Sequence, residues 1–162
     1  VCFSPDSTML IATCDRTANV WNVIDGILIY VLVGHNDLLY SVNFSPDGKK
    51  IITASNDNIA KIWDAYTGDL LYDLADHNAS LRSANVSPDS TQVVTASNDH
   101  KAKIWNVENG QLIQNLVGHT HYVMSAKFSP DGRKIFTASM DSHKEVPFPR
   151  FNATEGDSSI FI

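Results

Sequence analysis

The sequence predicts an all-β protein in which four similar antiparallel sheets follow one another within a single unit. The first observation is a short motif, Phe or Val followed by Ser-Pro-Asp, which begins at positions 3, 44, 86 and 128 of the 162 residues. The second is a recurrence of single aromatic and imidazole residues every 42 positions, as Trp21, Trp63 and Trp105 and as His35, His77 and His119. A fixed period in this range is typical of stacked repeats. We therefore expect one repetitive unit without independent domains.

The second repeat shows which elements one period contains. Apolar and polar residues alternate up to Phe44, and the Ser-Pro-Asp-Gly that follows predicts a hairpin turn, because proline favours the second position of such turns. Stretches with strand-forming residues come next, separated by Asn-Asp-Asn at 56–58 and by Thr-Gly at 67–68. The expected strands span residues 40–44, 50–55, 59–64 and 69–75. Four short strands per period predict the blade of a β-propeller rather than a helical repeat.

These landmarks resemble those of the WD-repeat family in order and in spacing. They are Gly-His at 34–35, Ser-Pro-Asp-Gly at 45–48, Ser-Asn-Asp at 55–57 and Trp-Asp at 63–64, and the likeness is strong over residues 1–141. The resemblance implies a β-propeller arc of about four WD-type, four-stranded antiparallel blades that form an incomplete ring. The expected blades span residues 1–33, 34–75, 76–117 and 118–162.

The first and last repeats depart from the pattern. The first has no Gly-His before Phe3, and Phe3 stands one residue closer to Asp15 than in the second repeat, so its second strand or the following turn must be tighter. The fourth is degenerate after Asp141, because Pro147 occupies the tryptophan slot and disfavours a regular strand there. Phe151 precedes a glycine by five residues, as each tryptophan does. This favours a fourth blade with an insertion and Phe151 in place of tryptophan; an unstructured tail is the alternative.

The composition narrows the classes of partner. The formal net charge is −6, so no basic field is present, and neither nucleic acid nor an anionic membrane is expected as a partner. The longest apolar run, residues 27–33, is far shorter than the ~20 residues that cross a bilayer. Cys2 and Cys14 are the only cysteines, which suits a reducing intracellular compartment, the cytoplasm or the nucleus. We expect two buried free thiols on neighbouring strands, with a single disulfide as the alternative.

Histidine, hydroxyl and aspartate side chains, the parts of a nucleophilic triad, recur together in three repeats. An active site needs one such set in one cleft. A hydrolase using a His-Asp-Ser set is therefore the disfavoured interpretation, and no catalytic residue is predicted. The resemblance implies that these groups and the tryptophan form a hydrogen-bond network inside each blade, which would satisfy a buried carboxylate. The expected members are His35, Thr53, Asp57, Trp63, His77, Thr95, Asp99, Trp105, His119, Thr137 and Asp141.

Several details of this network stay open. Each repeat also offers a serine hydroxyl, at Ser55, Ser97 and Ser139. The first blade lacks an upstream histidine and the fourth lacks the tryptophan, so we expect both to be weaker. Asp76 replaces the glycine that precedes the other two histidines, and we expect it to keep a left-handed turn, which aspartate tolerates. The one close histidine pair, His119 and His121, has no cysteine or carboxylate cluster beside it, so no metal and no cofactor is predicted.

Recognition is expected where the repeats differ on an exposed rim, because positions that recur unchanged build the blades. The slots that differ are the third and fifth residues after each histidine and the residue before each aspartate. In the WD-repeat family such slots face the narrow end of the ring. The candidate partner-binding residues are Leu38, Tyr40, Asn56, Ser80, Arg82, Asn98, Tyr122, Met124 and Met140. Tyrosine, arginine and methionine are types that anchor interfaces.

A scaffold or adaptor that binds a protein or peptide partner is the function that these observations favour. A truncated or degenerate repeat fragment without independent activity is the alternative. Propellers of the family generally close with about seven blades, and four blades leave two faces uncovered. Closure therefore requires further blades of a longer chain, which is the interpretation we favour, or a second copy that completes a ring of about eight blades.

Overall fold

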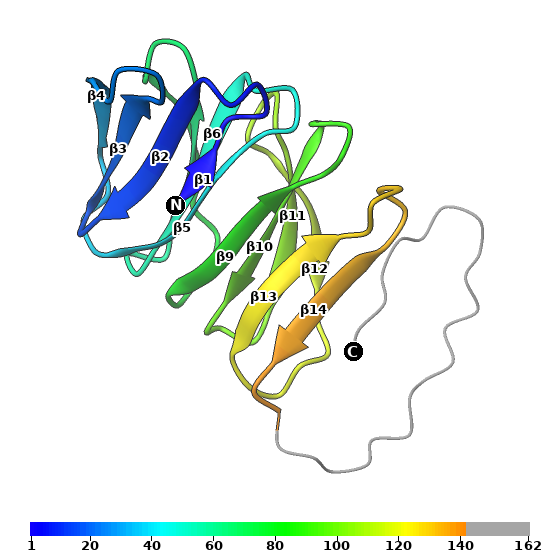
Figure 1. Ribbon diagram of the computed structural model, residues 1–162. Helices are drawn as coiled ribbons and strands as arrows, with labels where there is room; N and C mark the ends of the chain where they lie inside the picture. The colour runs from blue at the N-terminus through cyan, green and yellow to red at the C-terminus, as the bar shows by residue number, and fades with distance from the viewer. Residues whose placement is uncertain (142–162) are drawn as a thin grey trace.

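The computed structural model describes residues 1–141, which form antiparallel sheets standing side by side in an arc (Figure 1). This part of the chain contains no helix, and hence none that is long and apolar enough to cross a membrane. Its strands are β1 (Cys2–Phe3), β2 (Met9–Cys14), β3 (Thr17–Asn22), β4 (Leu28–Val33), β5 (Leu39–Phe44), β6 (Lys50–Ser55), β7 (Ala60–Asp64), β8 (Leu70–Leu74), β9 (Leu81–Val86), β10 (Gln92–Ser97), β11 (Ala102–Asn106), β12 (Leu112–Leu116), β13 (Val123–Phe128) and β14 (Ile135–Ser139).

Within each sheet the strands pair in the order in which they occur along the chain. Blade 1 holds β1 to β4, blade 2 holds β5 to β8 and blade 3 holds β9 to β12; the described residues of blade 4 contain β13 and β14. The predicted all-β arc of sequential antiparallel sheets is confirmed. The two interpretations of the chain around Phe151 fall outside the described residues.

The Ser-Pro-Asp motif closes the hairpin between the first two strands of each blade. In blade 2, Ser45 Oγ donates to Asp47 Oδ1 (2.6 Å) and accepts the backbone N–H of Lys50 (2.9 Å). Gly48 follows with a φ of 73°, a left-handed conformation that carries no steric penalty for glycine. The same serine–aspartate bond recurs in the other three blades. The motif is therefore a local device that satisfies its own polar groups.

Neighbouring blades bury apolar faces against each other. Between blades 1 and 2, Ile11 and Val20 belong to the same buried cluster as Ile51 and Trp63. Equivalent clusters join blade 2 to blade 3 and blade 3 to blade 4. Because successive residues of a strand point to opposite faces, a blade inside the arc supplies one face to each neighbour. This stacking places the inner strands β5, β9 and β13 side by side.

The predicted strand bounds of blade 2 are correct to within one residue. The second strand has the predicted bounds, 50–55, and the first begins one residue early, at Leu39. The third begins at Ala60 rather than Ile59, because the Ile59 N–H donates to Asp57 Oδ1 and so belongs to the turn. The fourth is one residue shorter at each end.

Blade 1 shows how the missing residue of its repeat is accommodated. Its second strand, β2, has the same length as β6, so the tightening lies in the turn that follows. Cys14 pairs with Thr17, which leaves a two-residue turn of Asp15 and Arg16. Asp15 adopts a φ of 51°, a left-handed conformation that aspartate tolerates better than most residues.

The two cysteines are free and lie on neighbouring strands, but neither is buried. Cys2 is half-buried and Cys14 is exposed, so the expected burial was wrong. Cys14 points to the opposite face of β2 from Ile11, which packs against blade 2. Burial of this face depends on whether another blade covers it, and the pattern of β2 alone does not contain that information.

The candidate binding rim and the network beneath it

Blade 2 contains a network of four side chains. His35 Nδ1 lies 2.9 Å from Asp57 Oδ2, and His35 Nε2 lies 2.7 Å from Thr53 Oγ1. Trp63 Nε1 donates to the same threonine hydroxyl (2.9 Å). His35 precedes β5, Thr53 lies in β6, Asp57 in the following turn and Trp63 in β7. The network therefore connects the segment before β5, the strands β6 and β7, and the turn between these two strands.

The donors and acceptors of this network fit one consistent assignment. The indole of Trp63 can only donate, and ionised Asp57 can only accept. Thr53 therefore accepts from the indole and donates its own proton to Nε2 of His35, whose Nδ1–H donates to Asp57. The imidazole is neutral in this arrangement. Burial lowers the pKa of His35, although the bond to Asp57 opposes that shift, which agrees with a neutral ring.

Asp57 also accepts hydrogen bonds from the backbone. Its carboxylate accepts the N–H of Asn36 (2.9 Å) and the N–H of Ile59 (3.1 Å). Burial by itself would raise the pKa of Asp57, but these N–H groups and His35 outweigh it and hold the pKa below its ordinary value. The ionised carboxylate thus connects the segment before β5 to the turn after β6.

The network recurs in blades 3 and 4. The contacts are His77 with Asp99 (2.7 Å) and Thr95 (2.8 Å), Trp105 with Thr95 (2.9 Å), and His119 with Asp141 (2.7 Å) and Thr137 (2.8 Å). Burial would raise the pKa of Asp99, but the hydrogen bond from His77 and the neighbouring N–H groups bring it to about 2. Within residues 1–141 the blade 4 set has no tryptophan.

The serine hydroxyls that the sequence left as alternatives make other contacts. Ser55 Oγ donates to the carbonyl of Asp37 (3.0 Å) and accepts the N–H of Asp57 (3.1 Å), and Ser97 makes the same two kinds of bond in blade 3. The threonine contacts the histidine and tryptophan, whereas the serine braces the turn. All four of these hydroxyl residues in blades 2 and 3 are fully buried, so none presents its hydroxyl to solvent.

The expected left-handed backbone at Asp76 was wrong. Neither Asp76 nor the equivalent Gly34 has a positive φ. At Gly34 the constraint is space, because an added Cβ would lie 3.1 Å from Cη2 of Trp63. Asp76 instead contacts buried Lys103 through its carboxylate, and Lys103 Nζ also donates to the Asp76 carbonyl (3.0 Å).

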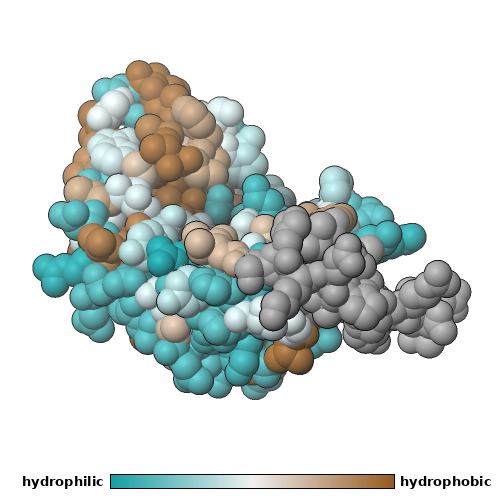
Figure 2. All heavy atoms as spheres, turned by 90° about the horizontal axis from the view of Figure 1, so that it is seen from below, coloured by the Kyte–Doolittle hydropathy of each residue, from teal (hydrophilic) through white to brown (hydrophobic). Residues whose placement is uncertain are grey.

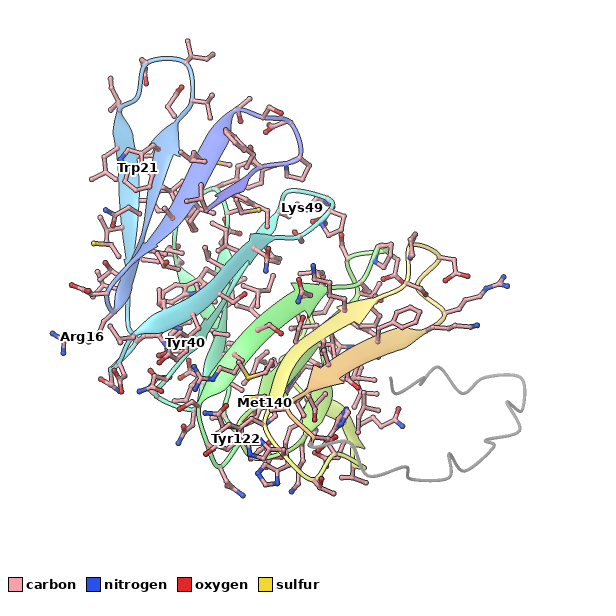
Figure 3. The ribbon with its side chains drawn as sticks, turned by 60° about the horizontal axis from the view of Figure 1, so that its bottom comes forward. Arg16, Trp21, Tyr40, Lys49, Tyr122 and Met140 are labelled. Carbon is pink, nitrogen blue, oxygen red and sulfur yellow. The ribbon has the colours of Figure 1, made fainter. Side chains whose placement is uncertain are left out.

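The predicted partner-binding residues gather at one end of the arc. Figure 3 shows Tyr40, Tyr122 and Met140 at the same end as Arg16, with Lys49 at the opposite end. The nine predicted residues are called the rim below. Those with exposed side chains are Leu38, Tyr40, Tyr122, Met124 and Met140, and those that are half-buried are Asn56, Ser80, Arg82 and Asn98.

One chain of rim contacts crosses from blade 2 to blade 3. The guanidinium Cζ of Arg82 lies 4.7 Å from the centroid of the Tyr40 ring. Arg82 Nε donates to Asn98 Oδ1 (2.9 Å). Tyr40 lies on β5, Arg82 on β9 and Asn98 in the turn after β10. Side chains that are far apart in the sequence thus form one continuous surface.

A second chain of contacts includes Asp37, which the sequence analysis missed. Asn56 Nδ2 donates to Asp37 Oδ2 (2.7 Å), and Ser80 Oγ donates to Asn56 Oδ1 (2.5 Å). Asp37 stands two residues after His35, a slot that also differs between repeats. Variation at that slot is the signal that could have identified it.

Between blades 3 and 4 the rim residue Tyr122 belongs to a cluster of rings whose other members were also missed. The imidazoles of His100 and His121 stack with centroids 6.0 Å apart, and His121 meets Tyr122 edge-on at 4.6 Å. His100 follows Asp99 directly, as Arg16 follows the aspartate of blade 1. Variation of the residue after each aspartate was the available signal. Within residues 1–141 no group of three or more His, Cys, Asp or Glu side chains could hold a metal ion.

Comparison with protein families places this geometry in context. The chain matches the family described as WD domain, G-beta repeat, over residues 1–22, 26–64, 68–106 and 110–143. The sequence repeat and the blade are out of phase. The match over 26–64 covers the outer strand of blade 1, β4, together with β5, β6 and β7 of blade 2. The matches that begin at residues 26, 68 and 110 therefore each link two neighbouring blades.

Curated relatives match shorter segments. The F-box-like/WD repeat-containing protein TBL1X of Mus musculus is 42% identical over 48 residues, which are 28% of this chain and 9% of that protein. The intraflagellar transport protein 122 homolog of Xenopus tropicalis is 38% identical over 53 residues, 33% of this chain and 4% of that protein. The chain thus spans a small fraction of the length of these relatives. Because four family matches cover most of its residues, the chain belongs to the WD-repeat family.

Proposed function

We propose that this chain is a scaffold module that binds a protein or peptide partner through its rim and performs no catalysis. The observation that carries the proposal is the separation of two sets of residues. In blades 2 to 4 the recurring residues form hydrogen-bond networks that are largely buried, whereas residues that differ between blades gather at one end of the arc, where they are exposed or half-buried. Variable side chains on a rigid scaffold are typical of recognition surfaces.

The chemistry of the rim fits a protein partner. Tyr40, Tyr122, Met124 and Met140 expose aromatic and thioether surface, and such side chains are enriched among interface anchors. The half-buried polar residues between them are held by hydrogen bonds, which reduces the conformational entropy lost on binding. The net charge of −6 opposes a polyphosphate partner.

We further propose that the module forms part of a larger propeller. Phe3 exposes 57% of its surface, whereas the equivalent Phe44 of blade 2 exposes 8% because it packs against blade 1. Ile29, Val31 and Val33 of β4 are exposed as well, and Figure 2 shows hydrophobic residues gathered over blade 1. Further blades of a longer chain would cover this face, and a second copy is the alternative. The free thiols support an intracellular location, in the cytoplasm or the nucleus.

Light scattering separates the two ways of covering blade 1. A mass near 17.8 kDa that does not change with concentration supports the need for further blades. A concentration-independent mass of twice that value supports the ring of two copies and contradicts the larger-chain interpretation.

The binding proposal is tested by affinity capture from cell extract followed by mass spectrometry. The variant Tyr122→Ala/Met140→Ala removes two exposed rim anchors, and Lys49→Ala/Arg133→Ala is the matched control in the turns that join β5 to β6 and β13 to β14. We expect a protein captured by the wild type and by the control to be lost from the rim variant. Equal capture by all three, with equal circular dichroism spectra, would show that the rim is not the binding surface.

A further inference from the structure

Arg82 is held in place on two sides. Its guanidinium stacks on the Tyr40 ring at 4.7 Å, and its Nε donates to Asn98 Oδ1 at 2.9 Å. It lies on β9 directly after Leu81, which is fully buried. An arginine fixed in this way has already lost much of its side-chain freedom, so binding of a further group loses little more.

The same guanidinium has no anionic partner among residues 1–141. Its five N–H groups form a planar fork, of which the one on Nε is used by Asn98. No carboxylate of the described chain forms an ion pair with it. The two buried lysines differ in this respect, because Lys61 pairs with Asp73 and Lys103 with Asp76. A half-buried, immobilised and unpaired arginine is an open position for a planar anion.

The neighbours of Arg82 indicate what surrounds that anion. Tyr40, Arg82 and Met124 occupy the same slot in three successive repeats and lie on the adjacent inner strands β5, β9 and β13. Tyr40 and Met124 are both exposed. Aromatic and thioether surface therefore flanks the guanidinium on the two sides, and a ligand that pairs with Arg82 contacts apolar groups on either side of its anion.

The geometry points to Arg82 as a receptor for a carboxylate, and to a partner segment that presents an Asp or Glu residue between apolar residues. This inference rests on the proposed function, because it names the chemistry of the partner that the rim binds. A carboxylate matches the remaining Nη1/Nη2 edge of the guanidinium through two parallel hydrogen bonds. One fixed cation in a chain of net charge −6 suits a single carboxylate better than a run of phosphates.

A displayed library of random dodecapeptides, selected on the full chain, tests the inference. We expect the peptides that bind the wild type to be enriched in Asp or Glu flanked by apolar residues. The same selection on Arg82→Gln should lose this enrichment. Arg133→Gln removes the same charge from the turn between β13 and β14 and should retain the enrichment.

Affinity measurements with one selected peptide then test the pairing of its acidic residue with Arg82. Replacing its acidic residue by the amide should weaken binding to the wild type by roughly 10- to 100-fold and leave binding to Arg82→Gln unchanged. Arg82→Lys keeps the charge but not the planar fork, so it should weaken binding by roughly 5- to 20-fold. An amidated and a free-acid form of the peptide distinguish a side-chain carboxylate from the peptide's own C-terminus as the bound group.

The outcomes separate this inference from the proposed function. Peptides that bind equally well to wild type and Arg82→Gln, yet are lost from Tyr122→Ala/Met140→Ala, would overturn the carboxylate receptor and leave the rim as a binding surface. Peptides that bind all variants equally, or an absence of binders, would contradict both. If Arg82→Gln does not fold, the acid-to-amide change in the peptide tests the same pair on the unaltered protein.

Discussion

Blades 3 and 4 share most of the repeat residues of their first two strands, and the described residues of blade 4 contain no counterpart of Trp105. In blade 3, Trp105 donates to Thr95 and packs against blade 2. Between blades 3 and 4, the positions that correspond to the surroundings of Trp105 line a cavity of about 270 Å³. The apolar walls of that cavity are Ile104, Ile113, Phe128 and Ile135. The residues 42 positions earlier are Ile62, Leu71, Val86 and Val93, all of which pack in the cluster that contains Trp105.

The comparison shows that the histidine–aspartate bond of a repeat also forms where the aspartate is more exposed to solvent. His119 and Asp141 keep the same 2.7 Å contact as His77 and Asp99. However, the Asp141 side chain exposes 35% of its surface, against 7% for Asp99. The same hydrogen bond therefore lies in two different dielectric environments, and its loss should matter more where solvent is excluded.

The largest effect is expected from the tryptophan itself. Trp105→Ala should lower the free energy of unfolding by about 3–5 kcal/mol, because it creates a void between two blades and removes the donor to Thr95. Urea denaturation measures this loss. Trp21→Ala, the same change at the half-buried tryptophan of blade 1, is the control and should cost clearly less. Equal losses would mean that the burial of Trp105 between two blades does not make it more important for stability than Trp21.

Removal of the histidine should have an intermediate and unequal effect in the two blades. His77→Ala removes one hydrogen-bond partner from the shielded Asp99 and one from the buried Thr95, and it should cost about 3 kcal/mol of unfolding free energy. His119→Ala leaves Asp141 in contact with solvent and should cost about 1 kcal/mol. Both variants are compared by urea denaturation at neutral pH. A larger loss for His119→Ala would refute the role that we assign to shielding.

The pH dependence of stability should reflect the same contrast. The pKa of His35 is lowered below 6.5 in the folded state, so its contribution is complete above pH 6.5 and declines as the pH falls below that value. The pKa of Asp99 falls from 3.8 to about 2, so its contribution is present above about pH 4 and is lost as the pH falls towards 2. We expect the urea midpoint to decrease steadily from pH 7 to pH 2.

Two asparagine variants identify which aspartate causes this loss of stability in acid. Asp99→Asn should flatten the decline between pH 4 and pH 2 more than Asp141→Asn does. The pKa of Asp141 is also lowered, first by its bond from Ser139, but solvent screens its exposed carboxylate. A protein more stable at pH 5 than at pH 7 would contradict the neutral state assigned to His35.

The smallest effects are expected at the rim. Tyr40→Ala removes the stacking partner of Arg82 and should cost about 0.5–1 kcal/mol of unfolding free energy. Met124→Ala, at the equivalent exposed slot one blade away from Arg82, should change it by less than about 0.5 kcal/mol. Thermal unfolding midpoints of the two variants test this order. Losses above about 2 kcal/mol at either position would place it in the core rather than on a binding surface.

The features that could be predicted from the sequence depend on residues of one repeat. The bounds 50–55 of β6 follow from the alternation and turn residues around them. The grouping of His35 with Thr53 and Asp57 follows from their recurrence at constant spacing in three repeats. The choice between Thr53 and Ser55 as the shared hydroxyl was left open, because residues two positions apart in a strand point to the same side and the strand pattern does not separate the two hydroxyls.

The features that could not be predicted depend on contacts between blades. Cys14 was expected to be buried, although no described residue covers its face of blade 1. Asp76 was expected to adopt a left-handed turn, but it contacts Lys103, 27 residues further along the chain. The stacking of Arg82 on Tyr40 joins residues of two blades, and neither residue pattern alone indicates that the two side chains meet.

The sequence by itself determined the period, the four-stranded blade and the set of side chains in each network, because these depend on turn chemistry and on hydrogen bonds between segments within one repeat. The tertiary structure decided which blade faces are covered, which rim side chains touch and where a cavity lies between blades 3 and 4. These properties depend on how one sheet stacks on the next. Because the repeats are similar, the sequence predicts the same sheet for each blade. The sheets differ in the contacts between their faces and between their rim residues.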